Sequence, residues 1–428
     1  MKILLINTFD RGGAANSAIR LHNGLLNENI ESRMLLKIKS KDLHNTFDFD
    51  IKLTFINIQV ERIKKILNRL DFKKICREKI LNNRPNGLEL FSFPSSKIDI
   101  TNSILYKNSE IIHLHWVANF LDWKTFFRKN KKPIVWTLHD ENPFLGGEHY
   151  DERFLGINEF GNPIKRIKNK NEILTEIKLK SQKMKYLESA KNVYIVCPSL
   201  WLLNKSKKSE IFKNIPHFHI PYGFPTNVFK PLDKDFCRSI FGIETNKKIM
   251  LFVADSQINN RKGMSYLSRA IEELNLEPGF EIICCTIGSG TILSQSENIL
   301  NLGKIEDEKL MAIAYNLADV FIIPSLEDNL PNTMIESILC GTPVIGFNSG
   351  GISEVIINGE NGWLCPEISV SSLKTTIKKY LLKGVSQSHS EISERARSKY
   401  SLEIQALEYV KLYEKILYKN EVGFKEPI

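Results

Sequence analysis

Short apolar runs rich in isoleucine and valine alternate with longer helical stretches along almost the whole chain. In the first half we expect strands at Lys2–Asn7, Arg33–Ile38, Ile111–His115, Ile134–His139, Val193–Pro198 and His217–Tyr222. In the second half we expect them at Ile249–Ala254, Glu281–Gly288, Asn298–Leu302, Val320–Pro324 and Pro343–Phe347. Parallel sheets with helices on both faces give this alternation. The sequence therefore predicts an α/β protein.

The chain of 428 residues is too long for one compact core and suits two domains. Prolines and glycines gather between Tyr222 and Lys247, so we place the domain junction there. The predicted N-terminal domain is 1–223 and the predicted C-terminal domain is 224–400. Ligands of open α/β sheets bind at the carboxyl ends of the strands. We therefore expect two facing Rossmann-like domains with the active site in the cleft between them.

The net charge of +10 favours an anionic partner, which could be nucleic acid, a sugar nucleotide or an anionic membrane surface. Much of the basic excess lies in the segments Arg62–Lys79 and Lys165–Lys185, which both carry apolar residues at helical spacing. The two apolar stripes contain Ile63, Ile66, Leu67 and Leu70, and Ile173, Leu174 and Ile177. Such helices either lie on anionic lipid or pack on a domain with a solvated lysine face. No recognised nucleic-acid module is present, so we expect no nucleic-acid partner.

No apolar run in the sequence approaches the length that crosses a bilayer, and the apolar start of the chain is too short for a signal peptide. The seven cysteines lack a disulfide-like spacing, which is typical of reduced cysteines in a cytosolic protein. We therefore expect a cytoplasmic protein, and the basic segments leave open a peripheral contact with the inner face of the plasma membrane.

The most informative stretch runs from Pro324 to Pro343, where a buried strand ends, a polar loop follows and a helix begins near Pro331. The loop and the helix N-terminus offer free N–H groups and a positive dipole end, which suit a phosphate. Asp328 lies in the loop, and Glu336 follows eight residues later, where its carboxylate can accept hydrogen bonds from sugar hydroxyls. For an isolated segment, the alternative is a capping Asp328 and a solvated Glu336.

Other candidate residues follow predicted strands in both halves. Gly12 and Gly13 follow the first strand, where glycine allows a ligand to approach the backbone closely, although a simple loop gives the same pattern. His139 ends another strand and either steadies a ligand or is an ordinary histidine with its own partners. In the second half, Arg261 and Lys262 follow a strand, as two phosphate-binding cations or as two solvated charges.

Together with the flanking strands and the Asn358–Leu364 turn, these residues resemble the donor-binding region of retaining glycosyltransferases of family 4, which have the GT-B fold. That family carries two acidic residues eight positions apart, which Asp328 and Glu336 match. The resemblance extends over nearly the whole chain, including a C-terminal helix at Ser401–Tyr418. In the family, this last segment packs back across both domains, so we expect 401–428 to complete the N-terminal domain.

The resemblance implies a role for each matching residue. Glu336 would bind the ribose, Lys262 the diphosphate, and the loop from Asp328 to Thr333 the transferred sugar and the diphosphate. The implied catalytic residues are His139, Asp328 and Glu336. The implied donor-binding residues are Gly12, Gly13, Arg261, Lys262, Gly288, Asn329, Leu330, Pro331, Asn332, Thr333 and Glu336.

The implied reaction is metal-independent transfer of a sugar, with retention of configuration, from a nucleoside diphosphate sugar to an acceptor hydroxyl. No cofactor is expected besides this co-substrate. The form of the 328–333 loop and the stretch from His113 to Trp116 look most like enzymes of bacterial surface polysaccharide biosynthesis (O-antigen, capsule or exopolysaccharide). The acceptor would then be a saccharide or a lipid-linked saccharide, and the basic helices would serve at the membrane.

The chain departs from the family pattern at several positions. Asp328 is shorter than the usual glutamate, Gln257 stands near the place of an expected arginine, and Tyr222 and Pro225 alter the interdomain linker. These departures keep open a catalytically decayed binding protein. A nicotinamide-dependent oxidoreductase is the other alternative, but no G-x-G-x-x-G follows any strand. His113 and His115 share one strand face without a third metal ligand at suitable spacing, so we expect no metal site.

Overall fold

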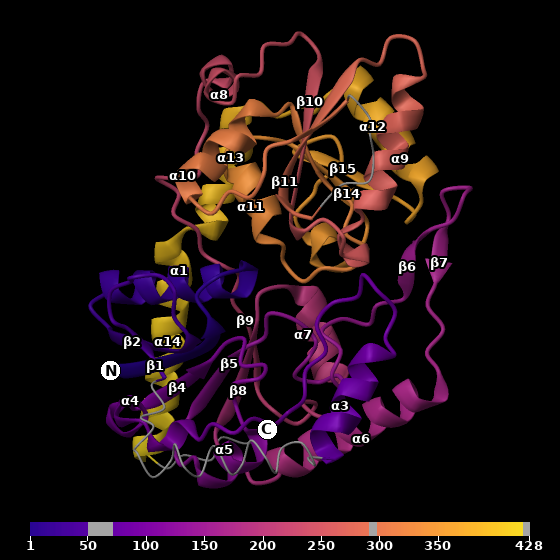
Figure 1. Cartoon of the computed structure of the whole chain (residues 1–428). Helices are drawn as coiled ribbons and strands as arrows, with labels where there is room; N and C mark the ends of the chain where they lie inside the picture. Colours follow the sequence, from indigo (N-terminus) through magenta and orange to yellow (C-terminus); the bar gives the residue numbers. More distant parts are fainter. Residues whose placement is uncertain (50–71, 291–297, 423–428) are drawn as a thin grey trace.

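The computed structural model describes residues 1–49, 72–290 and 298–422, and it contains two parallel sheets, one in each half of the chain (Figure 1). The seven-stranded sheet has the order β3-β2-β1-β4-β5-β8-β9, and the six-stranded sheet has the order β12-β11-β10-β13-β14-β15. Neighbouring strands are parallel throughout both sheets. The predicted α/β class with two facing Rossmann-like domains is confirmed.

The first sheet consists of β1 (Lys2–Phe9), β2 (Glu31–Ile38), β3 (Thr46–Asp48), β4 (Ile111–Leu114), β5 (Ile134–Thr137), β8 (Val193–Cys197) and β9 (His217–His219). Its helices are α1 (Gly13–Asn27), α3 (Phe72–Asn82), α4 (Ile104–Asn108), α5 (Trp123–Lys129), α6 (Lys170–Leu187) and α7 (Leu200–Lys208). Residues 62–71 of the predicted basic segment Arg62–Lys79, with its apolar stripe, lie outside the described residues.

The second sheet consists of β10 (Lys248–Ser256), β11 (Ile282–Ser289), β12 (Ile299–Asn301), β13 (Val320–Ile323), β14 (Val344–Phe347) and β15 (Gly362–Cys365). Its helices are α8 (Lys234–Ile240), α9 (Met264–Asn275), α10 (Glu308–Leu317), α11 (Asn332–Leu339), α12 (Val370–Lys383) and α13 (His389–Tyr400). Short 3-10 turns lie at Ile100–Asn102, Asn260–Lys262 and Gly350–Glu354.

Each sheet has an apolar core on both faces, because alternate strand residues point to opposite sides. In β1, Leu4 and Ile6 pack into one buried cluster, while Ile3 and Leu5 pack into another. In β10, the pairs Ile249 with Leu251 and Met250 with Phe252 divide between two clusters in the same way. Helices therefore cover both faces of each sheet.

Two segments tie the halves together. The C-terminal helix α14 (Leu402–Val422) returns to the first domain, where it packs against α1 (Figure 1). Its Tyr413 hydroxyl lies 2.6 Å from Nδ1 of the buried His113. A hairpin of β6 (Phe154–Ile157) and β7 (Pro163–Lys165) extends from the first half to the second, where Tyr266 of α9 donates a hydrogen bond to the Gly156 carbonyl.

Candidate active site

Two adjoining cavities of about 410 Å³ and 240 Å³ lie where the loops of the two sheets face each other. The larger one is lined by Gly12, Gly13, His139, Arg261, Lys262, Asp328, Asn329, Leu330, Pro331, Asn332 and Thr333, among others. The smaller one is lined by Gly288 and Glu336, and it shares Gly12, Gly13, Asn332 and Thr333 with the larger. The structure thus brings every residue of the predicted site to one continuous cleft.

Asp328 lies buried in the loop between β13 and α11, against two cations. Its Oδ2 accepts a hydrogen bond from Lys262 Nζ at 2.6 Å and lies 3.1 Å from Arg261 Nη1. Burial alone would raise the pKa of Asp328, but the Lys262 and Arg261 charges outweigh burial and hold that pKa well below its usual value. Asp328 is therefore an anion that positions Lys262, and it does not cap α11.

Arg261 is buried, which excludes the solvated charge considered from the sequence. It forms an ion pair with Glu89, and its guanidinium lies 4.1 Å from the centre of the Tyr150 ring. Burial would raise the pKa of Glu89, but Arg261 and Lys262 lower it to about 2. Arg261 is therefore held by protein groups of both domains. Glu89 and Tyr150 carry no sequence signal that would have identified them.

Glu336 is buried in α11 with a partner on each carboxylate oxygen, so the solvated alternative is excluded as well. Oε1 accepts a hydrogen bond from Arg20 Nη2 at 2.7 Å, and Oε2 accepts one from the Tyr315 hydroxyl at 2.8 Å. Arg20 belongs to α1 of the first domain and also donates to Glu308 Oε1. The ion pair between Arg20 and Glu336 therefore crosses the cleft at the position predicted to bind ribose.

His139 has a neighbour at each ring nitrogen. Its Nδ1 lies 2.7 Å from the Tyr222 hydroxyl, and its Nε2 lies 3.0 Å from His115 Nδ1. Burial lowers the pKa of His139 to about 4, although the adjacent Asp140 acts in the opposite direction. His139 is therefore neutral at pH 7. Tyr222, a departure from the family linker, lines the cleft and fixes the orientation of this imidazole.

The glycines and the first turn of α11 shape the cleft. Gly288 has φ of +145°, and a side chain there would overlap the Ala254 carbonyl oxygen. Gly13 lies beside the start of α11, where Asn332 Nδ2 donates to the Gly13 carbonyl at 2.9 Å. The first turn of any helix has backbone N–H groups without intrahelical partners. In α11, Asn332 and Thr333 of this turn line the cleft, at the loop that contains Asp328.

Gln257 occupies the position nearest to the expected arginine. Its side-chain amide is buried, and neither the oxygen nor the nitrogen has a hydrogen-bond partner among the described residues. Within the same part of the chain, no group of three or more His, Cys, Asp and Glu side chains is arranged to hold a metal ion. His113 instead contacts Tyr413 and Thr137, and His115 contacts His139.

Comparison with known proteins finds matches to glycosyltransferases. Residues 233–399 match the family model described as glycosyl transferases group 1. Over 172 residues the chain is 28% identical to a D-inositol 3-phosphate glycosyltransferase of Mycolicibacterium smegmatis, covering 37% of this chain and 38% of the relative. It is 27% identical over 188 residues to an N-acetyl-alpha-D-glucosaminyl L-malate synthase of Bacillus anthracis, covering 42% and 47%. The matched regions thus span less than half the length of these curated relatives.

Solved structures are similar over almost the whole chain. Sucrose-phosphate synthase from Thermosynechococcus elongatus has a TM-score of 0.64 at 17% identity, covering 98% of this chain and 99% of that one. Anabaena HepE in complex with UDP and glucose has a TM-score of 0.63 at 13% identity, covering 97% and 99%. At such identities the likeness concerns the fold alone, which is GT-B. The matches support the predicted resemblance at the level of this fold and of the broader glycosyltransferase family.

Proposed function

We propose that the protein is a retaining glycosyltransferase of family 4, which moves a sugar from a nucleoside diphosphate sugar to an acceptor hydroxyl. One observation carries the proposal. Lys262, Asp328 and Glu336 line one cleft, next to the first turn of α11 and within the segment that matches the glycosyl transferases group 1 model. A cation, free N–H groups and a carboxylate are the groups that a diphosphate and a ribose require.

The diphosphate would lie between Lys262 and the first turn of α11. As the sugar leaves, negative charge grows on the diphosphate, and fixed donors and cations stabilise such charge without a protein nucleophile. Lys262 would exchange its bond with Asp328 for a phosphate oxygen, so that Asp328 becomes free to accept a hydrogen bond from the transferred sugar. The proposed reaction uses neither a metal nor a further cofactor.

The ribose hydroxyls would bind Glu336, with Gly288 beside the base. Both Glu336 oxygens have protein partners, so ribose binding involves competition with Arg20 or with Tyr315 for the same carboxylate. UDP is the nucleotide to test first, because it occupies the solved HepE structure of similar fold. The neutral His139 would donate or accept a single hydrogen bond near the transferred sugar, through rearrangement of its contact with Tyr222 or His115.

A catalytically decayed sugar-nucleotide-binding protein is the second candidate. The observation that favours it is the pairing of Arg261 with Glu89, because Arg261 then adds little to the positive charge that Gln257 fails to supply. Turnover separates the two candidates. An enzyme releases the nucleoside diphosphate from a bound donor, whereas a decayed protein binds the donor and leaves it intact. Nothing in the cleft favours the oxidoreductase alternative.

We further propose a role in bacterial surface polysaccharide biosynthesis with a lipid-linked acceptor, at the cytoplasmic face of the membrane. Ile173, Leu174 and Ile177 of α6 are 45%, 53% and 59% exposed, so this apolar stripe does not pack on the domain. Exposed lysines flank it at positions 170, 178 and 185. In the described residues, no helix is both long enough and apolar enough to cross a bilayer. Sedimentation with anionic vesicles, compared between the wild type and an Ile173→Ser, Ile177→Ser variant, tests the membrane contact.

The donor assignment is tested by a thermal-shift screen against UDP-, GDP- and ADP-sugars without added metal, with NAD and NADP as controls. A ligand that binds only the folded state raises the melting temperature. We expect one nucleotide class to stabilise the wild type, and the shift to disappear in Lys262→Ala and Glu336→Ala. Lys309→Ala, which removes an exposed lysine of α10, is the matched control and should keep the shift. A response to NAD in place of the sugar nucleotides would overturn the proposal.

A further inference from the structure

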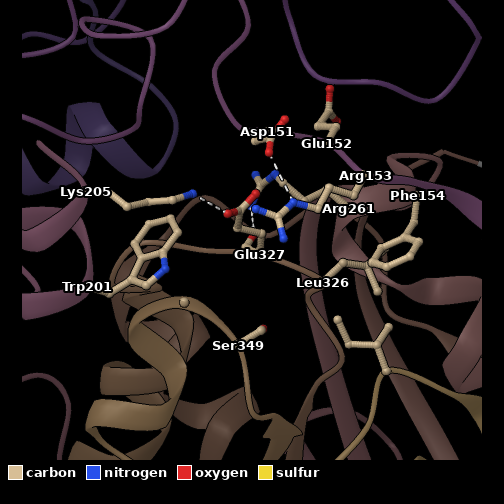
Figure 2. A pocket seen from close by; sticks show the side chains of 12 residues that line it. Asp151, Glu152, Arg153, Phe154, Trp201, Lys205, Arg261, Leu326, Glu327 and Ser349 are labelled. Carbon is tan, nitrogen blue, oxygen red and sulfur yellow. Dashed lines mark hydrogen bonds and ion pairs between the residues drawn. The ribbon is translucent and has the colours of Figure 1, made fainter. Parts of the chain in front are cut away.

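A further pocket of about 240 Å³ lies between the two domains, beside the cleft described above (Figure 2). Trp201 and Lys205 of α7 line one side, and Phe154 of β6 lines another. Leu326 and Glu327 contribute from the loop after β13. The pocket is thus built by both domains, and no part of the function proposed so far uses it.

The charged residues that line this pocket balance one another. They are Asp151, Glu152 and Glu327 on the acidic side and Arg153, Lys205 and Arg261 on the basic side. Lys205 Nζ donates to Glu327 Oε1 and to Glu141 Oε1, both at 2.7 Å. Arg153 Nε donates to Asp151 Oδ2 at 3.1 Å. An anion or a cation would meet side chains whose charges are already paired, so the lining suits a neutral ligand with both donors and acceptors.

Two aromatic rings flank the pocket. The Trp201 ring stands at one side and Phe154 at the other, with the charged groups between them (Figure 2). Lys205 Nζ lies 4.4 Å from the centre of the Trp201 ring. An apolar platform with converging polar groups is typical of small-molecule pockets, and a sugar ring presents both an apolar face and hydroxyls.

The pocket adjoins the site proposed for the transferred sugar. Glu327 lines the pocket while the next residue, Asp328, lines the cleft. Arg261 lines both. Lys262 and Glu336, which the proposed function assigns to the diphosphate and the ribose, line the cleft and not this pocket. A sugar ring in the pocket would therefore lie beside the donor and not within its nucleotide site.

We infer that this pocket is a subsite for a neutral sugar ring of the acceptor, stacked on Trp201 and hydrogen-bonded by Lys205 and Glu327. The inference rests on the proposed function for the identity of the reaction. It commits to an uncharged saccharide, because the charges that line the pocket already pair with one another or with neighbouring groups and leave none for an ionic ligand.

Binding is tested by saturation-transfer NMR with the methyl glycosides of glucose, galactose, mannose and N-acetylglucosamine, without nucleotide. We expect at least one glycoside to receive saturation from the wild type. Trp201→Ala should weaken its binding about tenfold or more, whereas Trp201→Phe should stay within about threefold of the wild type because it keeps an aromatic ring. If no glycoside shows binding that depends on Trp201, the inference is wrong. Circular dichroism of each variant verifies that it is folded.

The acceptor role is tested by release of the nucleoside diphosphate from the donor that gives the largest thermal shift, with and without the bound glycoside. A ligand in the acceptor site either accepts the sugar or excludes water, so it changes the rate of nucleoside diphosphate release. In Trp201→Ala the same change should need about tenfold more glycoside. A glycoside that saturates the pocket without changing this release would overturn the acceptor assignment. If no donor binds or is cleaved, the proposed function fails, while the NMR result still decides whether the pocket binds saccharide.

Discussion

Replacing Arg20 with methionine should strongly destabilise the protein, because it removes the cation from a buried ion pair. The Arg20 and Glu336 side chains are only 5% and 8% exposed, and Arg20 Nη2 lies 2.7 Å from Glu336 Oε1. In the variant, the Glu336 carboxylate stays buried with the Tyr315 hydroxyl as its one remaining partner among the described residues. Removing one member of a buried pair costs about 3–5 kcal/mol.

The magnitude can be separated from simple loss of packing by a double-mutant cycle. Glu336→Gln removes the unpaired charge, so Arg20→Met, Glu336→Gln should be more stable than Arg20→Met alone. We expect a coupling free energy of about 2 kcal/mol or more between the two positions. Glu308, the other partner of Arg20, is 40% exposed and remains hydrated. Glu308→Gln is therefore the matched control, with an expected cost under about 1 kcal/mol.

Differential scanning calorimetry of the four proteins of the cycle, without ligand, measures this coupling. The entropy of unfolding scales with chain length, so a chain of 428 residues shifts by about 1 °C per kcal/mol. Arg20→Met should therefore lower the melting temperature by roughly 3–5 °C, and the double variant should recover part of that loss. Additive effects of the two substitutions would refute the reasoning, because they would mean that Arg20 and Glu336 do not pair across the cleft. A large loss of stability in Glu308→Gln would instead mean that the ion pair of Arg20 with the exposed Glu308 is the more important one.

Three further predictions follow from single groups. Burial lowers the pKa of Lys183 to about 7, so above pH 7 the unfolded chain binds more protons at this lysine than the folded chain does. Between pH 7 and 10, urea titrations should show that the unfolding free energy of the wild type rises relative to that of Lys183→Met, by up to about 1.4 kcal/mol per pH unit. A constant difference between the two proteins would contradict this pKa. Gly263 has φ of +74°, and a side chain there would overlap the Pro324 carbonyl oxygen. Gly263→Ala should therefore lower the unfolding free energy by more than about 2 kcal/mol, as measured by thermal melting. The control Gly279→Ala has φ of +87° but open space around it, so it should cost about 1 kcal/mol. Asp328→Asn frees Lys262 from an ion pair and removes a negative charge from the cleft. Calorimetry should therefore show that UDP binds about fivefold more tightly, while the rate of sugar transfer falls. Weaker UDP binding would mean that Asp328 does not compete with the diphosphate for Lys262.

The sequence predicted the inner strands of each sheet, because both faces of these strands are buried and the apolar runs are continuous. It also predicted the short and partly exposed edge strands β9 and β12. All eleven expected strands are present, with ends that differ by a few residues. The strands β3, β6, β7 and β15 were not predicted. They have three or four residues each, and each contains a polar or glycine position that resembles a loop. Their pairing partners, and not their local patterns, make them strands.

The candidate site was predictable where local spacing fixes its geometry. Asp328 and Glu336 belong to one loop and the helix that follows it, so their placement follows from the segment itself. Arg20 and Glu89 were missed because they reach the cleft from the other domain, and no local spacing encodes a pairing across 316 or 172 positions. The sequence also left open whether Arg261 is solvated, since only the folded chain brings Glu89 to it.

The apolar stripe of α6 shows a different limit. Ile173, Leu174 and Ile177 have the helical spacing of a core-facing side, yet the buried side chains of this helix are Leu179, Lys183 and Leu187. The buried lysine donates to the carbonyls of Asn142 and Leu145, which no hydrophobic pattern can predict. Periodicity alone therefore identified the helix but not the side that faces the domain.

The most direct test of the central claim is hydrogen–deuterium exchange of the full chain with the sugar nucleotide that gives the largest thermal shift. If the donor binds as proposed, the backbone amides of 253–263, 286–290 and 326–336 should exchange more slowly in its presence. The same peptides of Lys262→Ala should show no such protection at the same nucleotide concentration. Unchanged exchange in these peptides of the wild type, or protection confined to the first half of the chain, would contradict a donor site in the second domain.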